Sequence, residues 1–270
     1  MIEFRSVTKA YPDGTVAVAD FTYTVESHRT VVLVGSSGSG KTTLLRMVNR
    51  MVDPTSGTVA IDGLDVRDLD KVALRRSIGY VLQAGGLLPH RTVLDNVATV
   101  PVLTGTPRRR ARTAAWELLE RVGLDRSLAG RYPAQLSGGQ QQRVGVARAL
   151  AGDPNILLMD EPFGAVDPIV RGELQVELRR LQAELGKTIV FVTHDIDEAF
   201  GLGDEVVVLR RGGEIAQAGT PAQILANPVD DFVRDFVGAD RAERVLTTVE
   251  VDGRCVVVDR DGRPAGVLAR

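Results

Sequence analysis

The stretch "TVVLVGSSGSGKTT", residues 30–43, decides the fold of this 270-residue chain. Its first six residues are a continuous apolar run, typical of a strand buried in a parallel sheet. A glycine-rich loop from Gly35 to Thr43 follows, and the next run, "TTLLRMVNRM", has the pattern of a helix. A loop of the form G-x-x-x-x-G-K-[ST] between a strand and a helix surrounds phosphate oxygens with backbone N–H groups. The sequence therefore predicts a nucleoside-triphosphate site.

The residues of this loop have separate predicted roles. Lys41 should reach the β- and γ-phosphates, and the Thr42 hydroxyl should bind Mg²⁺. The glycines let the backbone curl around the phosphates, and the helix N-terminus adds a favourable dipole. The predicted nucleotide-binding set in the loop is Gly35, Ser36, Ser37, Gly38, Ser39, Gly40, Lys41, Thr42 and Thr43.

Composition limits the partners that the chain should have. It carries 33 Lys and Arg against 35 Asp and Glu, which gives no global electrostatic reason to expect a nucleic acid. The start "MIEFRSVTKAY" does not resemble a signal peptide, and no apolar run reaches the roughly 18 residues that a membrane span needs. We expect a cytosolic chain unless a partner holds it at a membrane. The single cysteine, Cys255, excludes an intrachain disulfide.

Patterns outside the loop indicate an α/β fold. "IEFRSV" and "FTYTV" alternate apolar and polar residues around a turn at residues 13–14, which predicts an N-terminal antiparallel sheet. The apolar runs in residues 77–83, 155–162 and 187–195 alternate with helical patterns, which indicates a mainly parallel sheet. Between Gln83 and Leu136 the periodicity weakens, apart from an amphipathic helix over 108–122, and we expect a surface module there. A hairpin near residues 212–213 and a helix from Thr220 complete the domain near residue 238.

Two adjacent carboxylates end one buried strand. Asp160 and Glu161 stand where charges are costly unless a cation or a reaction needs them. Asp160 suits the role of holding Mg²⁺ through its water shell, and Glu161 suits that of a general base for an attacking water. A salt-bridged structural pair is the alternative interpretation.

Two further polar residues end strands at the same predicted edge. His194 alone would be read as an ordinary hydrogen-bond partner, but beside the other motifs it is predicted to orient water and substrate near the γ-phosphate. Gln83 is predicted to touch Mg²⁺ or the attacking water with its amide.

A second glycine-rich helix opening, "LSGGQQQR", occupies residues 136–143. The N–H groups of Ser137, Gly138 and Gly139 and the serine hydroxyl are suited to meet a γ-phosphate from the opposite side. Gln140 should support the turn, whereas the residues from Gln141 to Arg143 are interpreted as helix start and local packing.

Taken together, these motifs resemble those of the ATPase subunit of an ABC transporter, from residue 1 to about residue 238. "GSSGSGKTT" resembles its Walker A, Gln83 its Q-loop, "LSGGQ" its signature and "ILLMDEP" its extended Walker B. Asp167 resembles the D-loop aspartate, and His194 the switch histidine. Tyr11 stands where the family places an aromatic that stacks on adenine, although a lone tyrosine before a proline is also common in turn packing.

The resemblance implies a P-loop NTPase fold with a mainly parallel sheet core, an N-terminal antiparallel β subdomain and a helical subdomain, about residues 85–150, carrying the signature. It implies ATP and Mg²⁺ as cofactors and a head-to-tail dimer, expected to be a homodimer, in which each ATP lies between one Walker A and the other signature. It also implies integral membrane permease subunits, an indirect solute-binding protein, no nucleic acid, and a peripheral place on the cytoplasmic face of the inner membrane.

Two segments, "IGYVLQAGGLLPHRTVLDNVA" and "TIVFVTHDIDEAF", resemble a particular subfamily more closely. Its members import osmoprotectants such as glycine betaine, carnitine and choline. An importer of another small solute, such as ergothioneine or an amino acid, is the alternative. A soluble remodelling ATPase and a degenerate cassette are weaker candidates, since the chain lacks a second cassette and every catalytic position is filled. Ala84 and Val166 depart mildly from the subfamily. Residues 239–270 resemble a truncated CBS strand pair, so osmosensing is not expected to carry over.

Overall fold

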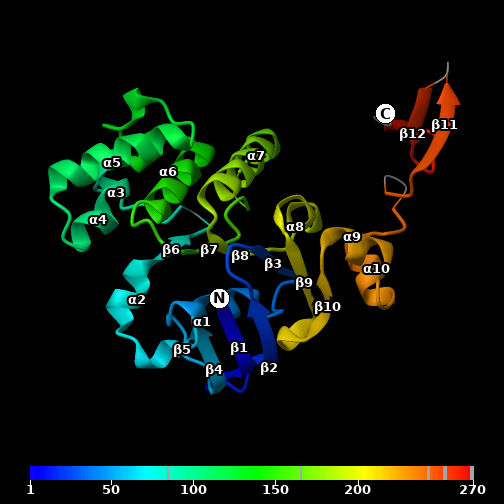
Figure 1. The fold of residues 1–270 in the computed structure, drawn as a ribbon, viewed down its shortest axis with the longest axis horizontal. Coiled ribbons are helices and arrows are strands. Elements are labelled where there is room, and N and C mark those ends of the chain that lie inside the picture. The colour runs from blue at the N-terminus through cyan, green and yellow to red at the C-terminus, as the bar shows by residue number, and fades with distance from the viewer. Residues whose placement is uncertain (84, 165, 242–243, 252–253, 268–270) are drawn as a thin grey trace.

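The computed structural model describes residues 1–83, 85–164, 166–241, 244–251 and 254–267. Two sheets with helices between and above them form the body of the molecule, and a small third sheet lies near the C-terminus (Figure 1). Ala84, where the sequence departs from the resembled subfamily, lies outside the described residues. No helix among the described residues has both the length and the apolar character needed to cross a bilayer.

A central six-stranded sheet has the order β10-β9-β3-β8-β7-β6. Every neighbouring pair is parallel except β9 and β10, which form the predicted antiparallel hairpin. The expectation of a mainly parallel sheet is therefore confirmed. Its strands are β3 (Thr30–Gly35), β6 (Ile78–Val81), β7 (Ile156–Asp160), β8 (Thr188–Thr193), β9 (Glu205–Leu209) and β10 (Ile215–Gly219).

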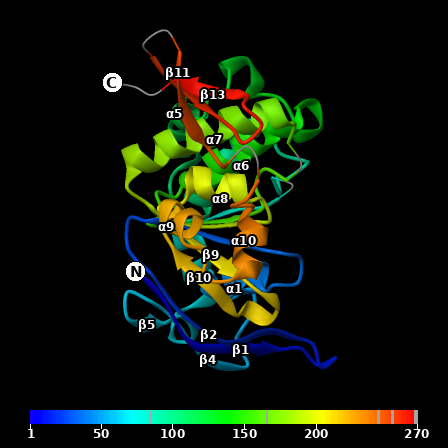
Figure 2. The same cartoon turned by 90° about the vertical axis from the view of Figure 1, so that its right-hand side faces the viewer.

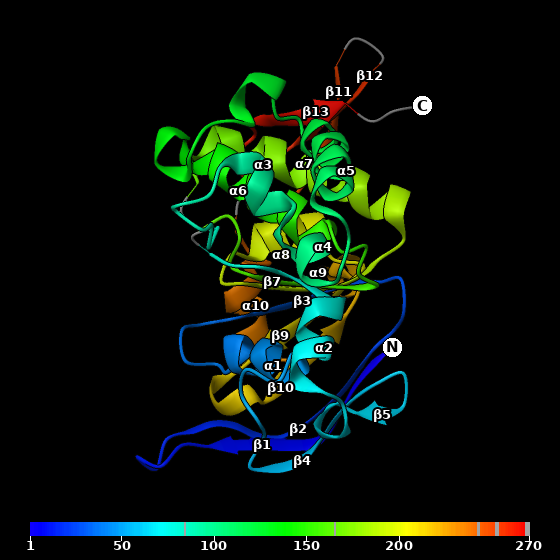
Figure 3. The same cartoon turned by 90° about the vertical axis from the view of Figure 1, so that its left-hand side faces the viewer.

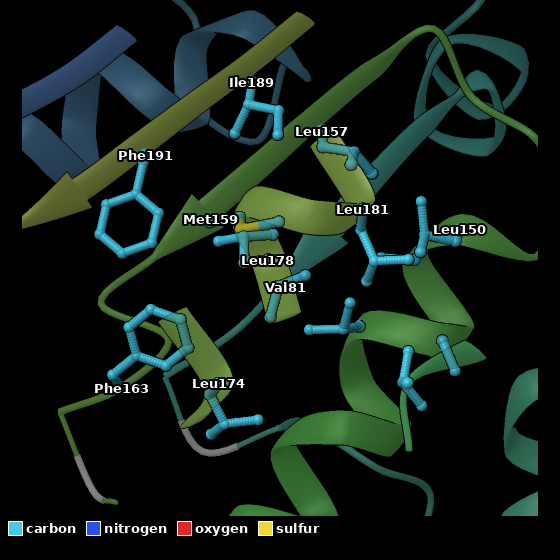
Figure 4. Close-up of a cluster of buried hydrophobic side chains, with 14 of the residues drawn as sticks. Val81, Leu150, Leu157, Met159, Phe163, Leu174, Leu178, Leu181, Ile189 and Phe191 are labelled. Carbon is cyan, nitrogen blue, oxygen red and sulfur yellow. The ribbon is translucent and has the colours of Figure 1, made fainter. Parts of the chain in front are cut away.

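The central sheet is buried on both faces, which explains its continuous apolar runs. In β3, Val32 and Val34 join the core beneath α6 (Gly138–Leu150), α7 (Pro168–Leu185) and α8 (Ile196–Leu202). The alternate residues Val31 and Leu33 join the second core, against α1 (Lys41–Val48). Figure 4 shows part of the first core, in which sheet residues meet α7. The residues are Val81, Leu157, Met159, Ile189 and Phe191 with Leu174, Leu178 and Leu181.

The predicted N-terminal antiparallel sheet is confirmed, with the order β2-β1-β4-β5. Its strands are β1 (Ile2–Ala10), β2 (Val16–Val25), β4 (Ser56–Ile61) and β5 (Leu64–Asp65). Figure 3 shows α1 between this sheet and the central one. A 3₁₀ turn (Val66–Asp68) and α2 (Lys71–Ser77) then lead the chain back to β6.

The segment between β6 and β7 is helical. The predicted amphipathic helix is α5 (Arg108–Arg121), and two 3₁₀ turns (Arg126–Leu128 and Pro133–Gln135) lead to α6. The structure adds α3 (Val93–Val97) and α4 (Thr99–Leu103), which the sequence did not indicate. Five-residue helices are too short to show a helical period. Local contacts hold α3 instead, because Thr92 caps it through the Asp95 N–H and Asn96 binds three carbonyls of the preceding loop.

Beyond the central sheet, Thr220 caps α9 (Pro221–Ala226) as predicted, and α10 (Asp231–Val237) ends at Gly238 with a φ of 63°. A three-stranded antiparallel sheet follows, with β11 (Thr247–Val251), β12 (Arg254–Val258) and β13 (Pro264–Val267) (Figure 2). The predicted strand pair corresponds to β12 and β13, and β11 is an addition. Arg244 ties this segment to the body through Asp197 and the Val237 carbonyl. The likeness to a CBS fragment stays a prediction.

Candidate active site

The phosphate loop has the backbone that its glycines predict. Gly38 and Gly40 adopt φ values of 80° and 86°, in the left-handed region. A Cβ at Gly40 would lie 2.4 Å from the Ala17 carbonyl oxygen of β2, and one at Gly35 would lie 2.5 Å from the Leu209 carbonyl oxygen. The loop is therefore held between two strands, and both positions exclude a larger residue.

The Lys41 ammonium lies beneath the loop. It donates to the carbonyls of Gly35 and Ser36 at 2.7 and 2.9 Å, and to Ser39 Oγ at 3.2 Å. Burial lowers the pKa of Lys41, and the nearby charges of Glu161 and Asp160 oppose that shift. The side chain is thus a buried cation held by neutral acceptors, which a phosphate oxygen would outcompete.

Asp160 and Thr42 meet at the end of β7. Thr42 Oγ1 donates to Asp160 Oδ1 at 2.8 Å, and Asp160 is only 7% exposed. This bond leaves the lone pairs of the hydroxyl available to a cation. A hydroxyl beside a carboxylate is a set of hard oxygen donors of the kind that Mg²⁺ prefers, so the residues fit the predicted metal.

The ion-pair alternative applies to Asp160 only in part. Its basic partner is Arg46, whose nearest nitrogen is 3.6 Å from Asp160 Oδ2 and whose side chain is 45% exposed. A half-exposed arginine at that distance is screened by solvent and neutralises the carboxylate weakly.

Glu161 is the centre of a second cluster. Its Oε2 accepts from Gln83 Nε2 at 3.5 Å and lies 3.3 Å from His194 Nδ1. The backbone of Glu161 has a φ of 44°, which is rare outside glycine, and its N–H donates to the Val192 carbonyl. The ends of β6, β7 and β8 thus bring together the three residues predicted at this edge. A carboxylate placed between an amide and an imidazole is suited to accept a proton from water.

The signature residues lie apart from the phosphate loop. Ser137 caps α6, its Oγ accepting from the Gln140 N–H at 3.3 Å while Gln140 Oε1 accepts from the Ser137 N–H at 3.0 Å. The predicted turn-supporting role of Gln140 is thus confirmed. In the described part of the chain, no hydrogen bond or ion pair joins residues 137–140 to the phosphate loop. Figure 1 shows α6 and α1 on opposite faces of the central sheet.

The remaining predicted residues are exposed. Tyr11 is 37% exposed in the turn before β2, with the Lys9 ammonium 5.3 Å from its ring centroid. Its backbone also closes that turn, through bonds with Thr15 and Gly14, so the residue supports the turn while part of its side chain stays exposed. Asp167 is exposed just before α7, where its carbonyl accepts from the Arg171 N–H.

The structure adds polar residues that the sequence reasoning missed. The Tyr80 hydroxyl donates to Asp160 Oδ2 at 3.3 Å, and burial raises the pKa of Tyr80, which keeps the hydroxyl protonated. Arg148 of α6 donates to the carbonyls of Gly86 and Gly85 at 2.7 and 2.9 Å, so it fastens the loop after Gln83 to the helix that carries the signature. No sequence signal singled out either residue, because the position of Tyr80 depends on strand pairing and the contacts of Arg148 are distant in sequence.

Known proteins are similar to this chain in sequence. The family model described as ABC transporter matches residues 18–164. The carnitine transport ATP-binding protein OpuCA of Listeria monocytogenes is 50% identical over 241 residues, covering 89% of this chain and 60% of that protein. The glycine betaine uptake system ATP-binding protein YehX of Escherichia coli is 50% identical over 266 residues, covering 98% of this chain and 85% of that protein.

A solved structure agrees in three dimensions. The dimeric structure of MJ0796, a bacterial ABC transporter cassette, superposes with a TM-score of 0.75 at 37% identity, covering 82% of this chain and 99% of that one. The chain spans 60% of the length of the Listeria relative, so the similarity to that protein is limited to the 241 aligned residues. On the match of the family model and the identity to YehX over most of both chains, this protein belongs to the ABC transporter family.

Proposed function

We propose that this chain is the ATP-binding and ATP-hydrolysing subunit of an ABC importer for quaternary-amine osmoprotectants. One observation carries the ATPase proposal. At a single edge of the central sheet, the Thr42–Asp160 pair stands beside the cluster of Glu161, Gln83 and His194. A metal-binding pair next to a base and two orienting groups is what phosphoryl transfer to water requires.

ATP would enter along the phosphate loop. Residues 35–43 supply backbone N–H groups and the α1 N-terminus, and the Lys41 ammonium moves from the Gly35 and Ser36 carbonyls to the β- and γ-phosphates. The exposed ring of Tyr11 stacks on adenine. Thr42, Gln83 and Asp160 would hold Mg²⁺, Asp160 through water, and the ion would neutralise phosphate charge when bound.

Glu161 acts in this proposal as the general base. Its carboxylate takes a proton from the attacking water, while His194 donates toward the γ-phosphate and Gln83 orients the water. The neighbouring side chains support these roles, since both contact the same oxygen, Oε2 of Glu161.

A second copy of the chain would complete each site. Ser137, Gly138, Gly139 and Gln140 open α6 on the face away from α1, so they serve the ATP of a head-to-tail partner, with Asp167 near the junction. The likeness to a cassette solved as a dimer supports this arrangement. ATP then closes the dimer and hydrolysis releases it, which is a population shift between two states.

The helices between β6 and β7 offer a place for membrane permease subunits. A cavity of about 290 Å³ opens there, lined among others by His90, Arg91, Asp95, Val102 and Tyr132. A permease docked in it would hold the chain at the cytoplasmic face of the inner membrane, with the solute-binding protein an indirect partner. The balanced charge gives no support for nucleic acid.

The solute class rests on the relatives, whose names refer to carnitine and to glycine betaine. The test is uptake of labelled glycine betaine by cells in which this chain is the only ATPase for its permease. Wild type should support uptake and Lys41→Ala should abolish it. Lys71→Ala, a surface lysine paired with Asp53, is the matched control and should behave as wild type. Betaine uptake that persists with Lys41→Ala would refute the proposal, and uptake of a different solute would refute its solute class.

A further inference from the structure

We propose that Tyr80 is a positioning residue of the Mg²⁺ site, whose hydroxyl fixes the orientation in which Asp160 presents its carboxylate to the metal. The inference rests on the proposed ATPase function and extends it to a residue outside the recognised motifs. Three features of the structure carry it: the strand register, the partners of the two carboxylate oxygens, and the charge balance around them.

The register of β6 against β7 places Tyr80 on the correct face. Tyr80 is the parallel partner of Leu158, and residues two apart on a strand share a face. Asp160 follows Leu158 by two, so Tyr80 and Asp160 both point toward α1. A long phenol spans the diagonal, and its hydroxyl reaches Asp160 Oδ2 at 3.3 Å.

The two oxygens of Asp160 have different partners. Oδ1 accepts from Thr42 on α1 at 2.8 Å, and Oδ2 accepts from Tyr80 on β6. A carboxylate bound at one oxygen only still rotates about its terminal torsion, which is broad. Bound at both oxygens, by donors from two different elements, it is held in one plane.

The charge of the donor matters as much as its position. Arg46 is the other group near Oδ2, at 3.6 Å and 45% exposed, beyond a good hydrogen bond. A neutral phenol orients the carboxylate without cancelling the negative charge that attracts the cation. Donors of this kind behind a metal ligand typically change metal affinity by roughly 10- to 100-fold when removed.

Gln83, two residues after the end of the same strand, contacts Glu161. Tyr80 and Gln83 are three residues apart on one continuous stretch of backbone, and they touch the two consecutive carboxylates Asp160 and Glu161. Residues at and just after the end of β6 therefore contact both the proposed metal ligand, Asp160, and the proposed base, Glu161.

The experiment measures Mg²⁺ dependence of nucleotide binding with the full chain. Binding of a fluorescent ATP analogue is titrated first in EDTA and then with rising Mg²⁺, and Mn²⁺ binding is followed by electron paramagnetic resonance. Tyr80→Phe should bind the analogue like wild type in EDTA but need about tenfold more Mg²⁺ for half-saturation. Tyr80→Met, which also lacks the donor, should shift in the same direction. Tyr23→Phe, at a half-buried tyrosine of β2, is the control and should not shift.

A double variant distinguishes positioning from general loosening of the fold. In an Asp160→Ala background, Tyr80→Phe should cause no further shift, because the acceptor of its hydrogen bond is gone. An unchanged Mg²⁺ midpoint in Tyr80→Phe, or an equal shift in the Asp160→Ala background, would overturn the inference and leave the proposed function intact. Wild-type protein that fails to bind the analogue even with Mg²⁺ would instead overturn the proposed function itself, and the inference with it.

Discussion

Replacing Glu161 with glutamine tests the proposed base with the smallest change of shape. The carboxamide keeps one oxygen, which can occupy the position of Oε2, where both Gln83 and His194 contact the side chain. It cannot take a proton from water. Nucleotide binding should therefore persist, because the phosphate loop and the Thr42–Asp160 pair are untouched, while hydrolysis should fall.

The expected loss follows from the surroundings of Glu161. A positioned general base contributes roughly 10²- to 10⁴-fold. The His194 imidazole, 3.3 Å away and 61% exposed, offers a substitute acceptor for the proton, which places the loss at the lower end. We expect ATP turnover to drop roughly 100- to 1000-fold, equivalent to about 2.7–4 kcal/mol of lost transition-state stabilisation.

Turnover is measured by phosphate release at saturating ATP, and oligomeric state by light scattering with ATP and Mg²⁺ present. Glu161→Gln should accumulate as an ATP-bound dimer. Glu214→Gln, a surface glutamate that is 69% exposed, is the matched control and should hydrolyse ATP as wild type does. Turnover by Glu161→Gln within threefold of wild type would refute the assignment of the base.

Three further predictions concern the loop, the signature and pH. Gly40→Ala should abolish nucleotide binding, because Gly40 has a φ of 86° and a Cβ there would lie 2.4 Å from a β2 carbonyl oxygen. The control Gly63→Ala, at a φ of 80° with open space around it, should lose only about 1–2 kcal/mol of stability. Equal nucleotide affinity in the two variants would contradict the steric argument. Ser137→Ala and Thr220→Ala each remove a capping box, and each should lower the free energy of unfolding in urea by about 1 kcal/mol. Only Ser137→Ala should also lose ATPase activity. A similar loss of activity in both variants would count against a phosphate contact of Ser137. Burial raises the pKa of Glu198 above its ordinary 4.5, so the folded state binds that proton more tightly than the unfolded state does. The stability of wild type relative to Glu198→Gln should therefore fall as pH rises through the raised pKa. A stability difference that does not change with pH would disprove the shift.

Much of the site followed from the sequence because its residues stand at strand ends. Parallel strands bring their carboxyl ends to one edge, so Gln83, Asp160, Glu161 and His194 had to meet once the strands were recognised. The phosphate loop could also be predicted from local sequence, since its glycines and Lys41 lie within residues 35–41. The capping of α6 by Ser137 and Gln140 followed from a four-residue pattern.

The parts that escaped prediction depend on register or on contacts distant in sequence. Tyr80 reaches Asp160 only because β6 pairs with β7 at Leu158, and the run "SIGYVLQ" says nothing of its neighbour. Arg148 binds carbonyls more than 60 residues away. The helix α3 is held by Thr92 and Asn96 rather than by an apolar period, so no pattern revealed it.

The central claim is that each ATP site needs two copies of the chain, and complementation between two inactive variants tests it most directly. Lys41→Ala lacks a working phosphate loop, and Ser137→Arg lacks a working signature. Each should be inactive alone, yet a mixed dimer contains one site with both parts intact, so an equal mixture should recover about a quarter of wild-type ATPase activity. No recovery on mixing, or full activity of Ser137→Arg alone, would contradict the shared site.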